Sequence, residues 1–290
     1  MLIEGREIRI TNPNKVLFPK HGITKAELIE YYIRMSGFIL PWLRDRPFTM
    51  VPYPDGVEGK SFYQKQRPED APSWLRSISI TSETRGHIDW ILVNDLPSLV
   101  YMVNRACIEM HAWFSRAPWL EAPDMAVFDI DPSGNTGFAD AVAASRLIKI
   151  ILDEYKLSAY VKTSGMLGVH IIVPIRPTPF NKVRGFLQKV CLLVEEADPS
   201  RFTAERMLDK RGDRVYLDAL QDARGKTIPT PYSVRAHPDA TVSMPLEWDE
   251  LFNEDTTPGQ FTVRTIEKRI EEKGDLFAPI YGMKQKLPGV

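Results

Sequence analysis

Two aspartates, one residue apart, close an apolar run in the middle of the chain. Asp129 and Asp131 stand in the sequence AVFDIDPSG. Residues two apart in a β-strand point to the same face, so both carboxylates would lie beside Val127, while Phe128 and Ile130 pack on the opposite face. Ionised carboxylates that close repel each other, and burial increases the repulsion. A divalent cation such as Mg²⁺ or Mn²⁺, which prefers oxygen ligands, would compensate for both charges.

The pair alone leaves other interpretations open. An Asp at the end of a strand often only starts a turn, and Pro132 to Gly134 predict such a turn, with the acids at the exposed end of the strand. Haloacid-dehalogenase-type phosphatases use the first Asp of such a pair as a nucleophile. Nucleotide-sugar transferases use a similar pair to hold Mn²⁺. A phosphatase or a nucleotide-sugar transferase that depends only on Asp129 and Asp131 is therefore an alternative.

A third acid, far away in the sequence, favours phosphoryl transfer. Asp218 lies in DRVYLDAL, a predicted strand in which it shares a face with Tyr216 and not with Val215 or Leu217. Taken alone, it would be the solvated end of a strand. Three carboxylates from two strands, however, are the minimum for a site that holds two ions and activates one oxygen while stabilising another.

A glycine-containing turn joins two predicted strands in KTSGMLGVHIIVP. Gly165 and Gly168 allow a tight turn and a close approach of the backbone to a ligand. Ser164 offers a hydroxyl, and backbone N–H groups in such a turn can bind phosphate oxygens. His170, at the start of the next strand, could donate a hydrogen bond to a phosphate. An ordinary hairpin with a structural histidine is the simpler interpretation of this motif by itself.

The composition excludes few classes of protein. The chain has 290 residues and a formal net charge of −1, so no overall charge attracts it to nucleic acid, and any basic binding surface must be local. Cys107 and Cys191 are far apart and lack the spacing of metal ligands, which favours a reduced, cytoplasmic protein. No apolar run is long enough to span a bilayer, and no membrane partner is expected.

Hydrophobic periodicity predicts mixed helices and strands. Residues 124–220 read in the order strand, helix, strand, strand, helix, strand, which is typical of a split βαβ arrangement. Thr24 and Glu27 have the spacing of a capping box at the start of a helix over 24–40. Further strands are predicted over 6–13, 48–51, 61–65, 78–82 and 87–93, and further helices over 95–103, 248–252 and 262–272.

Four motifs together resemble one family. They are FDIDPSG, KTSGMLGVHIIVP, VYLDALQDARGKT and PYSVRAHP, in this order and spacing. The chain resembles the polymerase domain of bacterial ligase D and its stand-alone archaeal relatives, in the archaeo-eukaryotic primase superfamily, from TNPNKVLFP through PLEWDEL. The resemblance implies an α+β primase-like fold in which central, mostly antiparallel sheets are flanked by helices. It also implies one domain over 1–290, with a DNA-end-binding lobe over roughly 1–120 and a catalytic lobe over 121–290.

The resemblance implies a role for each matching residue. Asp129, Asp131 and Asp218 match carboxylates that hold two ions, Mn²⁺ or Mg²⁺. His111 matches a histidine near the incoming sugar, and it or Ser164 is the candidate sensor of a 2′-hydroxyl. The other residues that match the nucleoside triphosphate site are Gly165, Gly168, His170, Arg211, Arg235, Phe62, Tyr63, Lys65 and, in place of a usual arginine, His237. Those that match the binding site for a DNA 5′-phosphate are Asn12, Lys15 and Lys25.

The implied function is DNA end joining. Such an enzyme extends a primer 3′-hydroxyl with nucleoside triphosphates, preferentially ribonucleotides, to fill short gaps at double-strand breaks. Its expected partners are DNA with gaps or 3′ overhangs, a Ku-type end-binding protein and a separate ATP-dependent ligase, because the chain has no Lys-x-Asp-Gly motif. Met166 and Leu167 replace a Gly-Lys pair common in relatives, which removes a positive charge near the triphosphate. A scaffold that binds DNA ends without catalysis is a second alternative.

Overall fold

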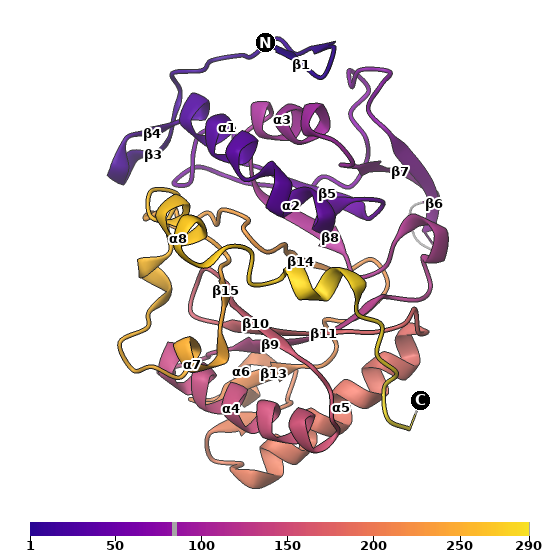
Figure 1. Ribbon diagram of the computed structural model, residues 1–290, viewed down its shortest axis with the longest axis vertical. Coiled ribbons are helices and arrows are strands. Elements are labelled where there is room, and N and C mark those ends of the chain that lie inside the picture. Colours follow the sequence, from indigo (N-terminus) through magenta and orange to yellow (C-terminus); the bar gives the residue numbers. More distant parts are fainter. Residues whose placement is uncertain (83–85, 290) are drawn as a thin grey trace.

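Two β-sheets organise the molecule. The computed structural model describes residues 1–82 and 86–289. A five-stranded sheet and a six-stranded sheet occupy the upper and lower halves of Figure 1. Helices cover the outer face of each sheet, and the N-terminus lies at the top of the view and the C-terminus at the right of its lower half (Figure 1). This arrangement confirms the expected α+β class.

The six-stranded sheet contains the strand that ends in the paired aspartates. Its central strand β9 (Met125–Asp131) pairs antiparallel with β11 (Val169–Pro174) on one side and with β13 (Val215–Asp218) on the other. The order across the sheet is β12-β13-β9-β11-β10-β15. The strands not yet given bounds are β10 (Tyr160–Thr163), β12 (Phe202–Thr203) and β15 (Pro245–Leu246).

The connections in this sheet confirm the predicted split arrangement. Strands β9 and β10 are both antiparallel to β11, which lies between them, so they run parallel to each other and are joined by α4 (Phe138–Glu154). In the same way β11 and β13 run parallel on either side of β9 and are joined through α5 (Phe180–Ala197). The short α6 (Leu208–Arg211) precedes β13. Both long helices contact β9, where they cover the face that carries Phe128 and Ile130.

The five-stranded sheet is antiparallel and has the order β14-β8-β5-β7-β6. Its strands are β5 (Pro47–Pro52), β6 (Ser77–Ser82), β7 (Gly86–Leu92), β8 (Cys107–Trp113) and β14 (Thr227–Pro229). The sequence did not predict β8, although every residue in it is buried. The strand predicted over 61–65 is wrong, because only Gln64 forms an isolated bridge there. One edge strand, β14, comes from the second half of the chain.

The helix predicted over 24–40 is two helices, α1 (Lys25–Arg34) and α2 (Ser36–Leu43). The chain turns at Met35, ahead of Ser36 and Gly37, which are weaker helix formers than the residues of α1. The predicted capping box at Thr24 is present, and Asp95 caps α3 (Leu96–Asn104). The remaining strands and helices are β1 (Leu2–Ile3), β2 (Arg6–Glu7), β3 (Val16–Phe18), β4 (Ile23–Thr24), α7 (Trp248–Leu251) and α8 (Ile266–Lys273).

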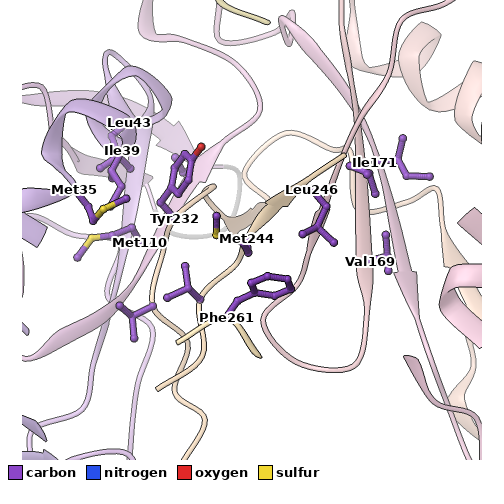
Figure 2. Packing of buried hydrophobic residues seen from close by; sticks show 14 of the residues in the cluster. Met35, Ile39, Leu43, Met110, Val169, Ile171, Tyr232, Met244, Leu246 and Phe261 are labelled. Carbon is purple, nitrogen blue, oxygen red and sulfur yellow. The ribbon is translucent and has the colours of Figure 1, made fainter. Parts of the chain in front are cut away.

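One hydrophobic core joins the two sheets. Figure 2 shows Met244, Leu246 and Phe261 between side chains of the five-stranded half, such as Met110, and Val169 of β11. Packing of this kind holds the sheets at a fixed separation, because close-packed protein interiors are hard to compress. Within residues 1–82 and 86–289, no helix combines the length and the apolar character needed to cross a bilayer.

Candidate active site

The strand register brings the three predicted carboxylates together. Asp218 of β13 lies directly opposite Asp129 of β9, and His170 of β11 lies opposite Asp129 on its other side. Asp131 lies two residues further along β9, opposite Tyr216. Residues directly opposite each other in antiparallel strands share a face of the sheet. The three acids and His170 therefore form one polar group on the face of β9 away from Phe128 and Ile130.

Asp129 and His170 of this polar group are buried, which the sequence did not indicate, whereas Asp131 and Asp218 are half-buried. Asp129 is 9% exposed, so the expectation of acids at an exposed strand end is wrong for it. Burial raises the pKa of Asp129 to about 7, and the charge of Asp218 acts in the same direction. Burial and the charges of Asp129 and Asp218 likewise raise the pKa of Asp131 to about 7. Crowded carboxylates in a low-dielectric setting resist ionisation unless a cation joins them.

The donor set fits a divalent cation. Oδ1 of Asp129 lies 3.1 Å from Nε2 of His170 but has no hydrogen bond of acceptable geometry from any residue that the structure describes. Oδ1 of Asp218 accepts hydrogen bonds from the Tyr216 hydroxyl at 3.0 Å and the Leu220 N–H at 2.9 Å, which fixes its carboxylate. No three acidic, His or Cys side chains in the described part of the chain enclose a metal by themselves. Mg²⁺ and Mn²⁺ sites of this open kind take further ligands from water and substrate phosphates.

A buried lysine that the sequence analysis did not single out supports His170. Lys162 is fully buried on β10, directly opposite His170 in the register. Its Nζ lies 2.6 Å from Nδ1 of His170 and 2.6 Å from Oγ of Ser243. Burial lowers the pKa of Lys162 well below its usual value, and burial followed by the charge of Lys162 does the same to His170. A lysine inside an otherwise apolar strand was the available signal in the sequence.

The glycine turn packs against the carboxylates. Oγ of Ser164 accepts hydrogen bonds from the N–H groups of Met166 at 3.1 Å and Gly168 at 3.0 Å, so the hydroxyl closes the turn. Gly165 has a φ of +78°, and a Cβ there would lie 2.4 Å from Cγ of Arg235. A Cβ on Gly168 would lie 3.0 Å from Oδ1 of Asp131. Both glycines are therefore needed for this close approach.

A second buried acid, Glu109, holds two of the predicted nucleotide-binding residues. Its Oε1 accepts hydrogen bonds from Nε of Arg235 and from the N–H of Ala236, both at 2.9 Å. Its Oε2 lies 2.7 Å from Nε2 of His111. Burial on its own would raise the pKa of Glu109, but the hydrogen bond with His111 and the charge of Arg235 outweigh it and lower this pKa to about 2. Arg235 also donates to the carbonyl of Ser164, which links Glu109 to the turn.

Comparisons with known proteins identify the family. The family model described as LigD, primase-polymerase domain, matches residues 24–277. The chain belongs to this family. Its sequence is 34% identical over 284 residues to the bifunctional non-homologous end joining protein LigD of Bacillus subtilis. This match covers 97% of this chain and 45% of the relative. The sequence is 31% identical over 276 residues to the multifunctional LigD of Mycolicibacterium smegmatis, covering 94% of this chain and 36% of the relative.

A solved structure supports the same assignment. The polymerase domain of Mycobacterium tuberculosis Ligase D, in complex with DNA, superimposes with a TM-score of 0.89 at 26% identity. The match covers 96% of this chain and 99% of the solved one. The fold expected from the sequence is thus confirmed, and so is the class of nucleotidyltransferase. The chain spans less than half the length of the two curated LigD relatives above.

The remaining predicted nucleotide-binding residues lie at different distances from the carboxylate cluster. Arg211 stacks on Tyr216, with its guanidinium carbon 3.5 Å from the ring centroid, which brings it close to Asp218. Phe62 and Tyr63 are 52% and 68% exposed, and the Tyr63 ring centroid lies 6.4 Å from that of His111. Two other predicted residues contact groups outside the carboxylate cluster, namely Lys65, over the ring of Trp90, and His237, beside Asp239.

Of the predicted 5′-phosphate residues, Asn12 and Lys15 lie in the loop before β3, and Lys25 is the first residue of α1. Lys25 is only 5% exposed, unlike an ordinary surface lysine. Its Nζ donates to the carbonyl of Thr11 at 2.6 Å, the hydroxyl of Thr11 at 3.3 Å and the carbonyl of Asn104 at 2.9 Å. The N–H of Lys15 donates to the carbonyl of Asn12 at 3.0 Å, and its Nζ forms a surface ion pair with Asp55 at 3.1 Å. Burial, with a smaller effect of Lys15, lowers the pKa of Lys25.

Proposed function

We propose that this chain is a metal-dependent polymerase for DNA end joining. It extends a primer 3′-hydroxyl with ribo- or deoxyribonucleoside triphosphates on a DNA template, fills short gaps at double-strand breaks and releases pyrophosphate. One observation supports this most strongly within the family: the register sets Asp218 opposite Asp129, with Asp131 two residues along the same strand. Neither a phosphatase nor a nucleotide-sugar transferase built on the first pair needs the third acid.

Asp129, Asp131 and Asp218 would hold two divalent ions, Mn²⁺ or Mg²⁺. When bound, such ions lower the pKa of the attacking hydroxyl and offset charge on the phosphates. The three carboxylates are suited to this because they are crowded and because Asp129 is buried and incompletely hydrogen-bonded. Their mutual repulsion is relieved only when positive charge arrives.

The other side chains of the site bind and orient the triphosphate. The N–H groups of Met166 and Gly168 are already bonded to Ser164, so they are not free for phosphate oxygens. The positive charge on this side comes from Arg235, which is fixed by Glu109 and by the Ser164 carbonyl. Fixed cationic groups stabilise the extra negative charge of the transition state without reorganising.

The first half of the chain, residues 1–120, would bind the DNA end. Lys15 would leave Asp55 for a 5′-phosphate at little cost, because exposed ion pairs contribute only about 0–1 kcal/mol. Lys25 and Asn12 would shape the loop and add fixed charge and polarity beside it. A Ku-type protein would deliver the end, and a separate ATP-dependent ligase would seal the nick.

Primer extension on a gapped duplex with a 5′-phosphate, Mn²⁺ and ribonucleotides tests this function. Asp218→Ala should reduce incorporation by at least about a thousandfold, since it removes a carboxylate that the reaction requires. DNA binding, measured by fluorescence anisotropy, should change little. Incorporation by Asp218→Ala at the wild-type rate would reject Asp218 as a required metal ligand, and no incorporation by the wild type would reject the polymerase.

A further inference from the structure

The imidazole of His111 has two nitrogens in very different surroundings. Nε2 lies 2.7 Å from a carboxylate oxygen of Glu109. Nδ1 is buried and has no hydrogen-bond partner among residues 1–82 and 86–289. An ionised carboxylate can only accept, so the proton of the neutral ring must lie on Nε2. Nδ1 is then left with a free lone pair and can only accept a hydrogen bond.

Glu109 cannot relax this arrangement by turning. Its other oxygen already accepts from Nε of Arg235 and from the N–H of Ala236. The side chain is 5% exposed, so no water can replace these contacts without rearrangement of the sheet. Arg235 and the backbone thus fix Glu109, and Glu109 fixes the polarity of His111. Unpaired buried acceptors of this kind are costly, and they often mark the place of a missing ligand.

His111 lies between two parts of the proposed nucleotide site. Tyr63, an exposed aromatic residue suited to support a base, approaches it edge-on at 6.4 Å between ring centroids. On the other side, Arg235 connects Glu109 to the turn at Ser164, whose Gly168 touches Asp131. A nucleotide with its base at Tyr63 and its phosphates at Asp131 would set its sugar beside His111.

We propose that Glu109 is a positioning residue that determines sugar specificity. It holds His111 with Nδ1 as an acceptor, so that the site selects a nucleotide whose 2′ group donates a hydrogen bond. A 2′-hydroxyl donates to Nδ1, whereas a 2′-deoxy sugar leaves this buried acceptor unpaired, and sites built for a hydroxyl discriminate against its absence. This inference rests on the proposed function. It gives Glu109 a role that acts through His111, since Glu109 itself does not touch the reacting atoms.

Nucleotide analogues test the direction of this hydrogen bond. Single-nucleotide extension opposite thymine would be measured with ATP, 2′-deoxyATP and 2′-fluoro-2′-deoxyATP, whose fluorine cannot donate. We expect kcat/KM for ATP to exceed that for 2′-deoxyATP by about tenfold, and the fluoro analogue to behave like 2′-deoxyATP. Equal use of ATP and the fluoro analogue overturns the inference alone. No extension with any of the three overturns the proposed function as well.

Glu109→Gln reverses the polarity without changing the size of the side chain. The amide oxygen must still accept from Arg235 and Ala236, so the amide nitrogen faces His111 and donates to Nε2, which moves the ring proton to Nδ1. The preference for ATP over 2′-deoxyATP should then fall to about twofold or less, and kcat/KM for the fluoro analogue should rise. Asp153→Asn is the matched control, since it removes an exposed carboxylate of α4 that pairs with Lys149 and should leave both rates and their ratio unchanged.

A direct measurement covers the case in which Glu109→Gln fails to fold. Nitrogen-15 NMR of the wild-type imidazoles, without nucleotide, distinguishes a protonated ring nitrogen from one with a lone pair. We expect the proton of His111 on Nε2. A spectrum with the proton on Nδ1, or an unchanged sugar preference in a folded Glu109→Gln variant, overturns the inference.

Discussion

Two regions of the molecule gather like charges but compensate for them differently. The carboxylate group consists of Asp129, Asp131 and Asp218 on β9 and β13. The lysine loop, as we call it, consists of Lys15, before β3, and Lys25, at the start of α1. The three hydrogen bonds of Lys25 are all to acceptors of the protein, and Lys15 has Asp55. Asp129 keeps an oxygen without a hydrogen bond in the described structure, and its pKa is raised to about 7. The lysine loop is therefore arranged for stability before DNA arrives, whereas the carboxylate group carries a repulsion that a proton or a bound cation must relieve.

The largest expected effect is at Asp129, where one substitution should lower activity and raise stability. Asp129→Asn should lower primer extension by at least about a thousandfold, because it removes a metal ligand. In metal-free buffer at pH 8 the same change should raise the free energy of unfolding, on the order of 1–3 kcal/mol, because a buried repulsive charge is gone. Primer extension and urea unfolding measure the two effects.

Asp153→Asn is the matched control for that variant. Asp153 lies on the solvent side of α4, where it pairs with Lys149 and is 54% exposed. The Asp153→Asn change should alter neither primer extension nor the free energy of unfolding noticeably, because surface ion pairs contribute little to stability. An Asp129→Asn protein that unfolds more easily than the wild type would contradict the idea of stored repulsion.

The lysine loop should show the opposite pattern. Lys25→Ala leaves the carbonyls of Thr11 and Asn104 without this buried donor, and should reduce the free energy of unfolding by about 1–3 kcal/mol. Lys15→Ala should change stability by less than about 0.5 kcal/mol. Both should weaken the selection for a 5′-phosphorylated gap over an unphosphorylated one, by about tenfold, in a competition assay.

Lys20→Ala controls for loss of charge in the same region, since Lys20 pairs with Asp239 and not with the loop that holds Asn12. Its gap selection should stay at the wild-type level. If Lys25→Ala proves as stable as the wild type, the buried contacts of this ammonium do not stabilise the fold as we infer.

The smallest expected effect is the pH dependence of metal-free stability. Asp129 and Asp131 keep protons up to a pKa of about 7 in the folded protein, whereas the unfolded chain releases them near 3.8. Stability from this source is therefore present below about pH 4 and is lost as pH rises towards 7. Buried His111 and His170, with lowered pKa values, act in the opposite direction.

The difference in unfolding free energy between the wild type and Asp129→Asn isolates the carboxylates, because both proteins contain the same histidines. This difference should grow from about pH 4 to pH 7 and shrink again when Mn²⁺ is added at pH 7.5. Parallel curves across this range would argue against the raised pKa values.

The local part of the site could be predicted from the sequence. Alternation in AVFDID assigns the two aspartates to one face, and the same rule joins Asp218 to Tyr216, whose hydroxyl indeed donates to it. The capping box at Thr24 is equally local. Each of these depends only on residues a few positions apart.

The buried network could not be predicted, because it depends on pairings far apart in the chain. CIEMHAW combines Glu109 and His111 with apolar residues, so its pattern indicates no clear strand, yet it is buried throughout. Glu109 is stabilised by Arg235, which follows 126 residues later. Lys162 tolerates full burial only because β11 and Ser243 bring it acceptors. Tertiary context of this kind overrides local preference.

Strand β14 has a consequence for producing parts of this protein. Thr227 to Pro229 pair with the outer edge of β8, opposite Trp113 to His111, so the sheet of the first half is completed by a segment from the second. A fragment ending near residue 120 would expose that edge along a strand that carries only buried residues. Open, apolar edges recruit other chains, so this fragment should aggregate unless residues 227–229 are supplied as a separate peptide.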